Sequence, residues 1–169
     1  MKGMTVFMVL TLLTGRLVAQ AAPVCDRHGV RTEVAIHAPA DSVWKVLTDV
    51  AAYPDWHPYM RTIEGKWKRG KMLHFTMVPT DKGERKFSAK LLVMDAPREW
   101  AWGGAFLFFL KARHSFVLTP NVDGGTLMVQ EERWGGMFGG SYGKKYFEEA
   151  CRNFEAMNRA LAERVASPK

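Results

Sequence analysis

Residues 60–134 constrain the fold of this chain more than any other stretch, because they contain one strand-like segment after another. Apolar and polar residues alternate with a period of two, as in Leu73-His74-Phe75-Thr76-Met77, and Asn121-Val122-Asp123-Gly124-Gly125 is typical of a hairpin turn. No segment between these strands is long enough for a crossover helix, and parallel neighbours need connections of about a dozen residues or more. The stretch therefore predicts an antiparallel sheet.

The segments on either side of the predicted sheet complete the expected architecture. Residues 30–36 alternate in the same way and predict an earlier strand. A short helix is expected after it, because residues 43–47 show helical spacing, and two nearby prolines make the next segment either a turn or a broken second helix. After the glycine-rich residues 135–140, apolar residues recur every three or four positions, which predicts one amphipathic helix of about 20 residues. The expected fold class is α+β, a curved antiparallel sheet of about seven strands wrapped around a long C-terminal helix.

The first 21 residues have the pattern of a signal peptide. Lys2 precedes an apolar run at residues 4–13 that is too short to span a bilayer, and Ala19-Gln20-Ala21 has the small-x-small pattern of a signal-peptidase site. Arg16, between the run and this site, is unusual in such a segment. We expect cleavage after Ala21, a single domain over residues 22–169, and a periplasmic or secreted location.

Charge and cysteine content narrow the classes of partner. The formal net charge is +7 at pH 7, and loss of Lys2 and Arg16 with the signal peptide lowers it by two. The basic residues form no run or nucleic-acid motif, so we expect no nucleic-acid partner, while transient contact with an anionic membrane stays open. Cys25 and Cys151 can pair in an oxidising compartment or remain free thiols. No Cys/His spacing matches a metal site, and we expect neither a metal nor another cofactor.

Two groups of motifs carry a family resemblance. Val43-Trp44-Lys45-Val46-Leu47-Thr48-Asp49, followed by Tyr53-Pro54-Asp55-Trp56-His57-Pro58, forms the first. His114-Ser115-Phe116, Gly124-Gly125-Thr126 and Glu131-Glu132-Arg133-Trp134 form the second. They are similar to the helix-to-turn signature and the closing hairpin of the START-like helix-grip superfamily (SRPBCC), which includes polyketide cyclase/dehydratase-like proteins. This resemblance covers about residues 30–165 and implies a helix-grip fold around an internal cavity, with two short helices after the first strand. His57 departs from the family pattern, in which Asn is frequent.

A hydrophobic small molecule is the expected partner, bound between the sheet and the long helix. The inward faces should be apolar, with one or two polar groups that orient the ligand. His114 is the expected polar contact because it shares a strand face with Phe116 and Leu118. A lipid, isoprenoid or polyketide-like compound would suit such walls, and transport would follow from reversible binding. The same stripe of residues would also suit a dry core. The predicted ligand-binding residues are Trp56, Tyr59, Phe75, Met77, Trp102, His114, Phe116, Trp134, Phe138, Phe147, Phe154 and Met157.

An enzyme of the cyclase/dehydratase type, acting on a polyketide-like substrate in the same cavity, is the alternative. It would need a general acid and a general base. Glu131 and Glu132 point to opposite sides of a strand, and the sequence leaves open which of them faces the cavity. No candidate occurs in a diagnostic spacing, so the catalytic residues stay unassigned and a non-enzymatic ligand-binding protein is favoured. The candidates are Asp55, His57, Tyr59, His114, Glu131, Glu132 and Arg133.

A glycine-rich loop is expected over residues 134–142. It combines its glycines with Trp134, Met137, Phe138 and Tyr142. Glycine allows the backbone to bend, and the apolar side chains give the loop a surface to close with. The loop therefore predicts either a lid over the cavity, which we favour, or an apolar patch that touches a membrane. The sequence makes no prediction about the oligomeric state.

Overall fold

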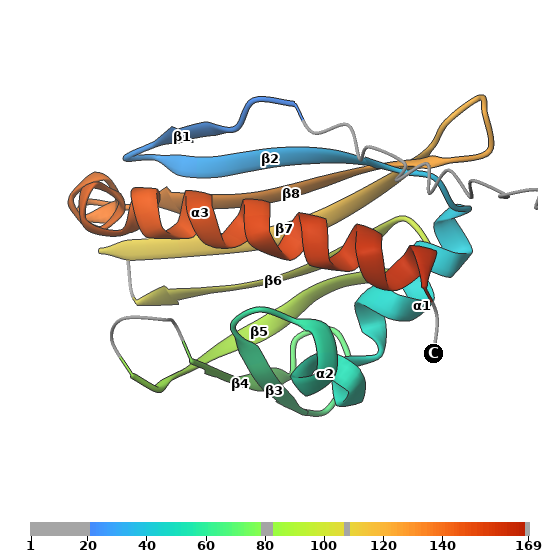
Figure 1. The fold of residues 1–169 in the computed structure, drawn as a ribbon. Helices are drawn as coiled ribbons and strands as arrows, with labels where there is room; N and C mark the ends of the chain where they lie inside the picture. Colours follow the sequence, from blue (N-terminus) through green and yellow to red (C-terminus); the bar gives the residue numbers. More distant parts are fainter. Residues whose placement is uncertain (1–20, 79–82, 107–108, 168–169) are drawn as a thin grey trace, which may run out of the picture.

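The computed structural model describes residues 21–78, 83–106 and 109–167 (Figure 1). The predicted signal peptide, apart from Ala21, lies outside the described residues. The elements are β1 (Val24–Asp26), β2 (Gly29–Ile36), α1 (Ala40–Thr48), the 3-10 helix η1 (Val50–Ala52), α2 (Tyr53–Trp56), β3 (Met60–Gly65), β4 (Met72–Met77), β5 (Arg85–Asp95), β6 (Glu99–Phe106), β7 (Leu110–Pro120), β8 (Thr126–Gly135) and α3 (Gly139–Ala166).

The strands form one eight-stranded sheet in the order β1-β2-β8-β7-β6-β5-β4-β3. Every neighbouring pair is antiparallel. Figure 1 shows the sheet curving around α3, with α1 beside the C-terminal end of that helix. The predicted helix-grip α+β fold, with two short helices after the first long strand, is confirmed. No helix in the described part of the chain is both long and apolar enough to cross a membrane.

The sheet has one strand more than the seven expected. The additional strand is β1, which has three residues and pairs only with β2. So short a segment shows no periodic pattern from which a strand could be predicted. Its turn into β2 is stabilised by Asp26, whose Oδ1 accepts the backbone N–H groups of His28 at 2.6 Å and Gly29 at 3.1 Å.

The long helix begins earlier than expected. α3 has 28 residues and starts at Gly139, so the expectation of a loop through Tyr142 is wrong. The glycines of its first turns allow close packing rather than bending. A Cβ on Gly143 would lie 1.9 Å from the carbonyl oxygen of Arg27, so the helix could not approach the β1–β2 hairpin with a larger residue there. A disulfide between Cys25 and Cys151, with Cα atoms 6.1 Å apart, links β1 to the same helix.

Buried apolar side chains form two clusters. The larger includes Leu47, Trp100 and Leu161 and joins the sheet to α1 and the C-terminal half of α3. The smaller includes Val30 and Trp134 and surrounds the disulfide. The dry core that the sequence left as an alternative therefore occupies part of the space between the sheet and α3.

The sheet separates between two of its central strands. β5 pairs with β6 over residues 90–95, with one irregularity. Within the described chain, residues 85–89 of β5 pair with β4 alone, and residues 104–106 of β6 pair with β7 alone. Gly103 stands where the strands diverge, and a Cβ there would lie 2.5 Å from the carbonyl oxygen of Ala112. Glycine is thus required at the edge of this window between β5 and β6.

Candidate functional site

A cavity of about 980 Å³ lies between the sheet and α3. Residues from β3 to β8, from α2 and the turn after it, and from α3 as far as Phe154 line it. Ser88 on β5 and Gly104 on β6 are among them, so the window between these strands leads into the cavity. Packed protein interiors contain few voids larger than a water molecule, so this volume is a pocket and not a packing defect.

One wall of the cavity is mainly apolar, although β5 also contributes Arg85, Lys86, Ser88 and Lys90 to the lining. Ile63, Met77 and Phe87 line it from the neighbouring strands β3, β4 and β5, and Trp102 lines it from β6. Phe87 is supported from behind by Phe75, with parallel rings whose centroids are 4.7 Å apart. This wall offers aromatic and thioether surface to a hydrophobic molecule.

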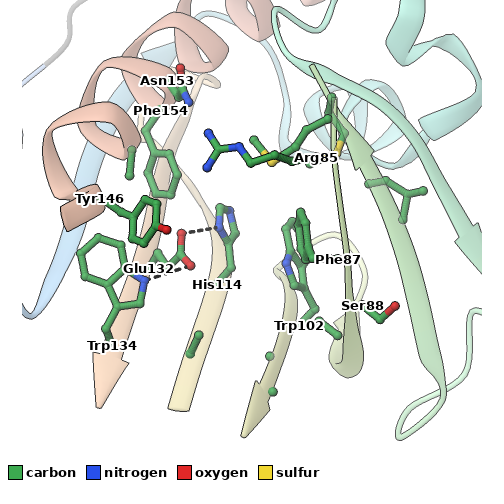
Figure 2. A pocket seen from close by; sticks show the side chains of 18 of the residues that line it. Arg85, Phe87, Ser88, Trp102, His114, Glu132, Trp134, Tyr146, Asn153 and Phe154 are labelled. Carbon is green, nitrogen blue, oxygen red and sulfur yellow. Dashed lines mark hydrogen bonds and ion pairs between the residues drawn. The ribbon is translucent and has the colours of Figure 1, made fainter. Parts of the chain in front are cut away.

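The opposite wall carries a cluster of polar side chains from β7 and β8 (Figure 2). Glu132 lies opposite His114 in the strand register, and its Oε2 is 3.7 Å from His114 Nδ1. Its Oε1 accepts a 3.1 Å hydrogen bond from Trp134 Nε1. Glu131 points to the outer face, where it accepts a 2.9 Å hydrogen bond from Arg133. Glu132 is therefore the cavity-facing member of the acidic pair.

The ring of His114 is held firmly in this cluster. It stacks on Trp102 with centroids 4.4 Å apart, and Phe154 contacts it edge-on at 4.9 Å. Glu132 Oε2 lies 3.7 Å from Nδ1, and the Gln130 amide nitrogen lies 3.3 Å from Nε2, so each ring nitrogen has a polar neighbour. The surroundings thus hold the orientation of the imidazole.

Gln130 extends the polar cluster deeper into the protein. Its side chain is fully buried and also interacts with the hydroxyl of Tyr59, whose pKa burial raises above its usual value. Within the described chain, Gln130 Oε1 has no hydrogen-bond partner. Gln130 thus ties the polar wall of the cavity to the buried side chains behind it.

Arg85 on β5 and Glu149 on α3 both line the cavity and form an ion pair that stays partly exposed to solvent, which places this pair at the mouth of the cavity. Figure 2 shows the Arg85 side chain reaching over the cavity towards α3. Tyr142 and Tyr146 of α3 also line the cavity, and their ring centroids are 4.5 Å apart. Burial, and then the nearby Glu132 carboxylate, raise the pKa of Tyr142.

His57 has a structural role in the turn after α2. Its Nδ1 accepts the backbone N–H of Met60 at 3.0 Å and that of Tyr59 at 3.4 Å. Burial, and then electrostatic interactions with Arg61 and His114, lower the pKa of His57 to about 3. The ring is therefore neutral at ordinary pH and holds this part of the cavity wall in place.

The other proton-transfer candidates divide between the cavity and the surface. His114, Glu132 and Tyr59 line the cavity, whereas Asp55 and Arg133 are exposed outside it. Among the described residues, no three His, Cys, Asp or Glu side chains come together as a metal site.

The predicted ligand-binding residues divide in a similar way. Phe75 and Met157 are buried in the larger core cluster, and Trp56 packs against its edge. Phe147 packs in the smaller cluster, and Phe138 lines a neighbouring surface hollow. The helical spacing of the apolar residues predicts a single apolar face on α3. In the structure, Met157 and Phe147 of this face pack in the two core clusters, whereas Phe154 also lines the cavity. The remaining predicted residues line the cavity: Tyr59, Met77, Trp102, His114, Phe116, Trp134 and Phe154.

Sequence reasoning did not identify Arg85, Gln130, Tyr146 or Asn153 as lining residues. For the two strand residues a signal was present. Side chains two residues apart in a strand lie on the same face. Arg85 therefore shares a face of β5 with the inward-facing Phe87, and Gln130 shares a face of β8 with Glu132 and Trp134. A polar residue on the inward face of a strand is the pattern that would have found both.

A curved antiparallel sheet closed around a long C-terminal helix, with a cavity between them, defines the START-like helix-grip class. Residues 27–167 match the family described as "Polyketide cyclase / dehydrase and lipid transport", and the chain belongs to this family.

Solved structures share the fold. Protein Ms6760 from Mycobacterium smegmatis matches with a TM-score of 0.69 and 13% identity, over 88% of this chain and 98% of that one. The Zhui aromatase/cyclase from Streptomyces sp. R1128 matches with a TM-score of 0.62 and 19% identity, over 83% of this chain and 96% of that one. No curated protein matches the sequence significantly. Identities this low show a common fold and not a common ligand or reaction.

Proposed function

We propose that the protein binds a hydrophobic small molecule carrying a hydrogen-bonding group, in the cavity between the sheet and α3. The observation that carries this proposal is a mainly apolar wall facing a buried polar cluster across about 980 Å³. Small-molecule sites are typically concave, mostly apolar, and roughly 300–1,000 Å³ in volume, with a few polar groups that orient the ligand. The cavity has each of these properties.

The two walls indicate the chemistry of the ligand. Met77, Phe87 and Trp102 provide surface for an apolar chain or ring. Across the cavity, His114, Gln130 and Glu132 line the polar wall, and the Glu132 side chain keeps 25% exposure. A hydroxyl or N–H group on the bound molecule can donate a hydrogen bond to the Glu132 carboxylate. A lipid, isoprenoid or polyketide-like compound with such a group meets both requirements, and reversible binding would allow the protein to transport it.

Native mass spectrometry of the protein purified from its own source tests the binding proposal. We expect a retained apolar compound that is released on denaturation. Gln130→Leu removes the amide at similar size and should weaken binding about tenfold. Glu131→Gln is the matched control, since Glu131 contacts Arg133 on the outer face, and it should bind normally. If no apolar compound is retained and fatty-acid, isoprenoid and polyketide-like probes all fail to bind, the proposal is wrong.

A cyclase- or dehydratase-type enzyme acting on a polyketide-like substrate is the second candidate. The contact between His114 and Glu132 inside the cavity favours it, because such a reaction needs positioned groups that take up and release protons. The aromatase/cyclase names of two structurally similar proteins also support it. Turnover of a polyketide-like substrate that is lost in His114→Ala, with substrate binding retained, would establish the enzyme over the binder.

We further propose that the protein is exported and acts in the periplasm or outside the cell. The Cys25–Cys151 disulfide supports this, because disulfides persist mainly in oxidising compartments. Cell fractionation and N-terminal sequencing test it, and we expect a mature chain that begins at Ala22. A chain recovered from the cytoplasm with its first 21 residues intact would contradict export.

A further inference from the structure

A second hollow, of about 580 Å³, lies on the surface beside the cavity. Leu110 and Tyr142 line both, so the hollow and the cavity are adjacent. The residues of the hollow come from the connection between β6 and β7 and from the start of α3. They are Phe109, Leu110, Phe138, Ser141 and Tyr142.

The segment before α3 is held against the β6–β7 connection. The backbone N–H of Phe138 donates to the carbonyl oxygen of Phe109 at 2.8 Å, and their rings stack with centroids 5.7 Å apart. Phe138 is nevertheless 53% exposed, and Met137 is 67% exposed. We call Phe109, Leu110, Met137, Phe138 and Tyr142 the apolar rim. Single exposed apolar residues are ordinary, but a contiguous group of them indicates a contact surface.

Lysines border the apolar rim. Lys111 follows Leu110 in β7, and Lys144 and Lys145 follow Tyr142 in α3; all three are exposed. Figure 1 shows the start of β7 and the start of α3 at the same end of the molecule. Apolar side chains within a lysine border are attracted to an anionic bilayer, where each lysine near the surface contributes about 1 kcal/mol.

We propose that the apolar rim docks on the surface of an anionic lipid bilayer. Met137 and Phe138 enter the headgroup region, and Lys111, Lys144 and Lys145 contact acidic headgroups. Phe138 stacks on Phe109 beside the cavity and does not line the cavity itself, which favours docking over a lid. Because the rim borders the cavity mouth, docking brings that mouth to the bilayer, and an apolar ligand can pass between the two without crossing water.

Co-sedimentation of the purified disulfide-bonded protein with lipid vesicles tests docking. Vesicles of equal parts phosphatidylglycerol and phosphatidylcholine should bind the protein, and phosphatidylcholine vesicles should bind it at least about tenfold more weakly. Binding to the anionic vesicles should fall as salt is raised, because salt screens the lysines.

Variants of the apolar rim and its border locate the contact. The double variant Met137→Ser/Phe138→Ser should weaken vesicle binding about tenfold or more. The double variant Lys144→Gln/Lys145→Gln should weaken it about thirtyfold, from about 1 kcal/mol for each lysine. Both variants should change the unfolding temperature little, since the four side chains are exposed and lose only the surface contacts of Phe138 with Phe109 and of Lys145 with the Tyr146 ring.

Matched controls lie at the other end of the sheet. Val122→Ser, in the turn between β7 and β8, removes a fully exposed apolar side chain. Lys66→Gln/Lys68→Gln, in the turn between β3 and β4, removes two exposed lysines. Both controls should bind vesicles as the unaltered protein does.

Three outcomes would overturn the proposal. The first is no binding to anionic vesicles, and the second is binding that the rim and lysine variants leave unchanged. The third is a concentration-dependent dimer, seen by light scattering, that Met137→Ser/Phe138→Ser abolishes while vesicles do not bind, which would assign the rim to a second copy of the chain. The vesicles carry no added ligand, so a failure of the ligand-binding proposal leaves this test unaffected.

Discussion

The two halves of α3 meet the same sheet in opposite ways. The C-terminal half buries Met157, Leu161 and Ala162 in the larger core cluster. The N-terminal half places Tyr146 and Glu149 beside a cavity instead. The same architecture therefore gives a packed core at one end and a pocket at the other, and side-chain chemistry along a single helix decides which.

Different interactions hold the two halves in place. The C-terminal half is held by apolar burial against α1 and the sheet. The N-terminal half borders a cavity and a window in the sheet, and it is held by the smaller core cluster, by the Cys25–Cys151 disulfide within that cluster, and by the close approach of Gly143 to Arg27. Stability and ligand binding should therefore respond differently to changes in each half.

Loss of the disulfide is the largest expected effect. Cys25→Ser with Cys151→Ser removes a link across 126 residues, and closing a loop of roughly that size stabilises a fold by about 4–5 kcal/mol through the unfolded chain. Urea unfolding should show this loss, and ligand release should accelerate because the cavity-lining half of α3 loosens. The unaltered protein with reductant should behave identically. A loss below about 1 kcal/mol would mean that packing alone holds this half.

A pair of truncations contrasts the core with the cavity. Leu161→Ala removes a fully buried side chain and should cost about 3 kcal/mol, with ligand affinity unchanged. Phe87→Ala removes a ring that is 39% exposed and borders existing space, so it should cost only about 1 kcal/mol while weakening ligand binding. Urea unfolding and ligand titration measure both. Equal costs of unfolding for the two variants would contradict the contrast.

Acid should destabilise the cavity wall through His57. The pKa of its ring is about 3 in the fold and about 6.5 in an unfolded chain, so between these values only the unfolded state takes up the proton. The full contribution is present above pH 6.5 and falls by about 1.4 kcal/mol per pH unit below it, or roughly 2 kcal/mol by pH 5.

The variant His57→Asn isolates this effect. Asn Oδ1 occupies the position of His Nδ1 and can accept the same backbone N–H groups, but it does not titrate. Lost ring contacts with Tyr53 and Tyr59 should lower stability by about 1 kcal/mol at pH 8. From pH 7 to pH 5 the unaltered protein should lose roughly 2 kcal/mol that the variant keeps, so the stability difference should reverse and the variant should be the more stable of the two at pH 5. A constant difference over this range would contradict the assignment.

Much of the fold was predictable from the sequence because alternation and helical spacing are local signals. Residues 30–36 and 73–77 are strands because one face of each is buried. The choice between Glu131 and Glu132 could not be predicted, since it depends on the register of β8 against β7, where Glu132 lies opposite His114.

The features that were missed depend on contacts between distant segments. Gly143 reads as a flexible residue until α3 is placed against Arg27, and the cysteine pairing requires the positions of both β1 and α3. The window at Gly103 arises because β5 and β6 pair over only part of their length. Single-segment patterns carry none of this information, and so they located the cavity only in part.

Loss of the ion pair at the cavity mouth should have the smallest effect on stability. It should change ligand release much more than it changes unfolding. Arg85 and Glu149 join β5 to the N-terminal half of α3 and keep 33% and 14% side-chain exposure. A partly exposed pair contributes about 0–1 kcal/mol, so Arg85→Gln should hardly change unfolding. It should still release a fluorescent fatty-acid probe several-fold faster in stopped-flow dissociation, because the link lies over the cavity. Arg133→Gln, which loses the outer-face pair with Glu131, should change neither property. Equally slow probe release from Arg85→Gln and Arg133→Gln would contradict this role of the ion pair. Other side chains would then close the mouth, and the attachment of the N-terminal half of α3 to β5 would not control access to the cavity.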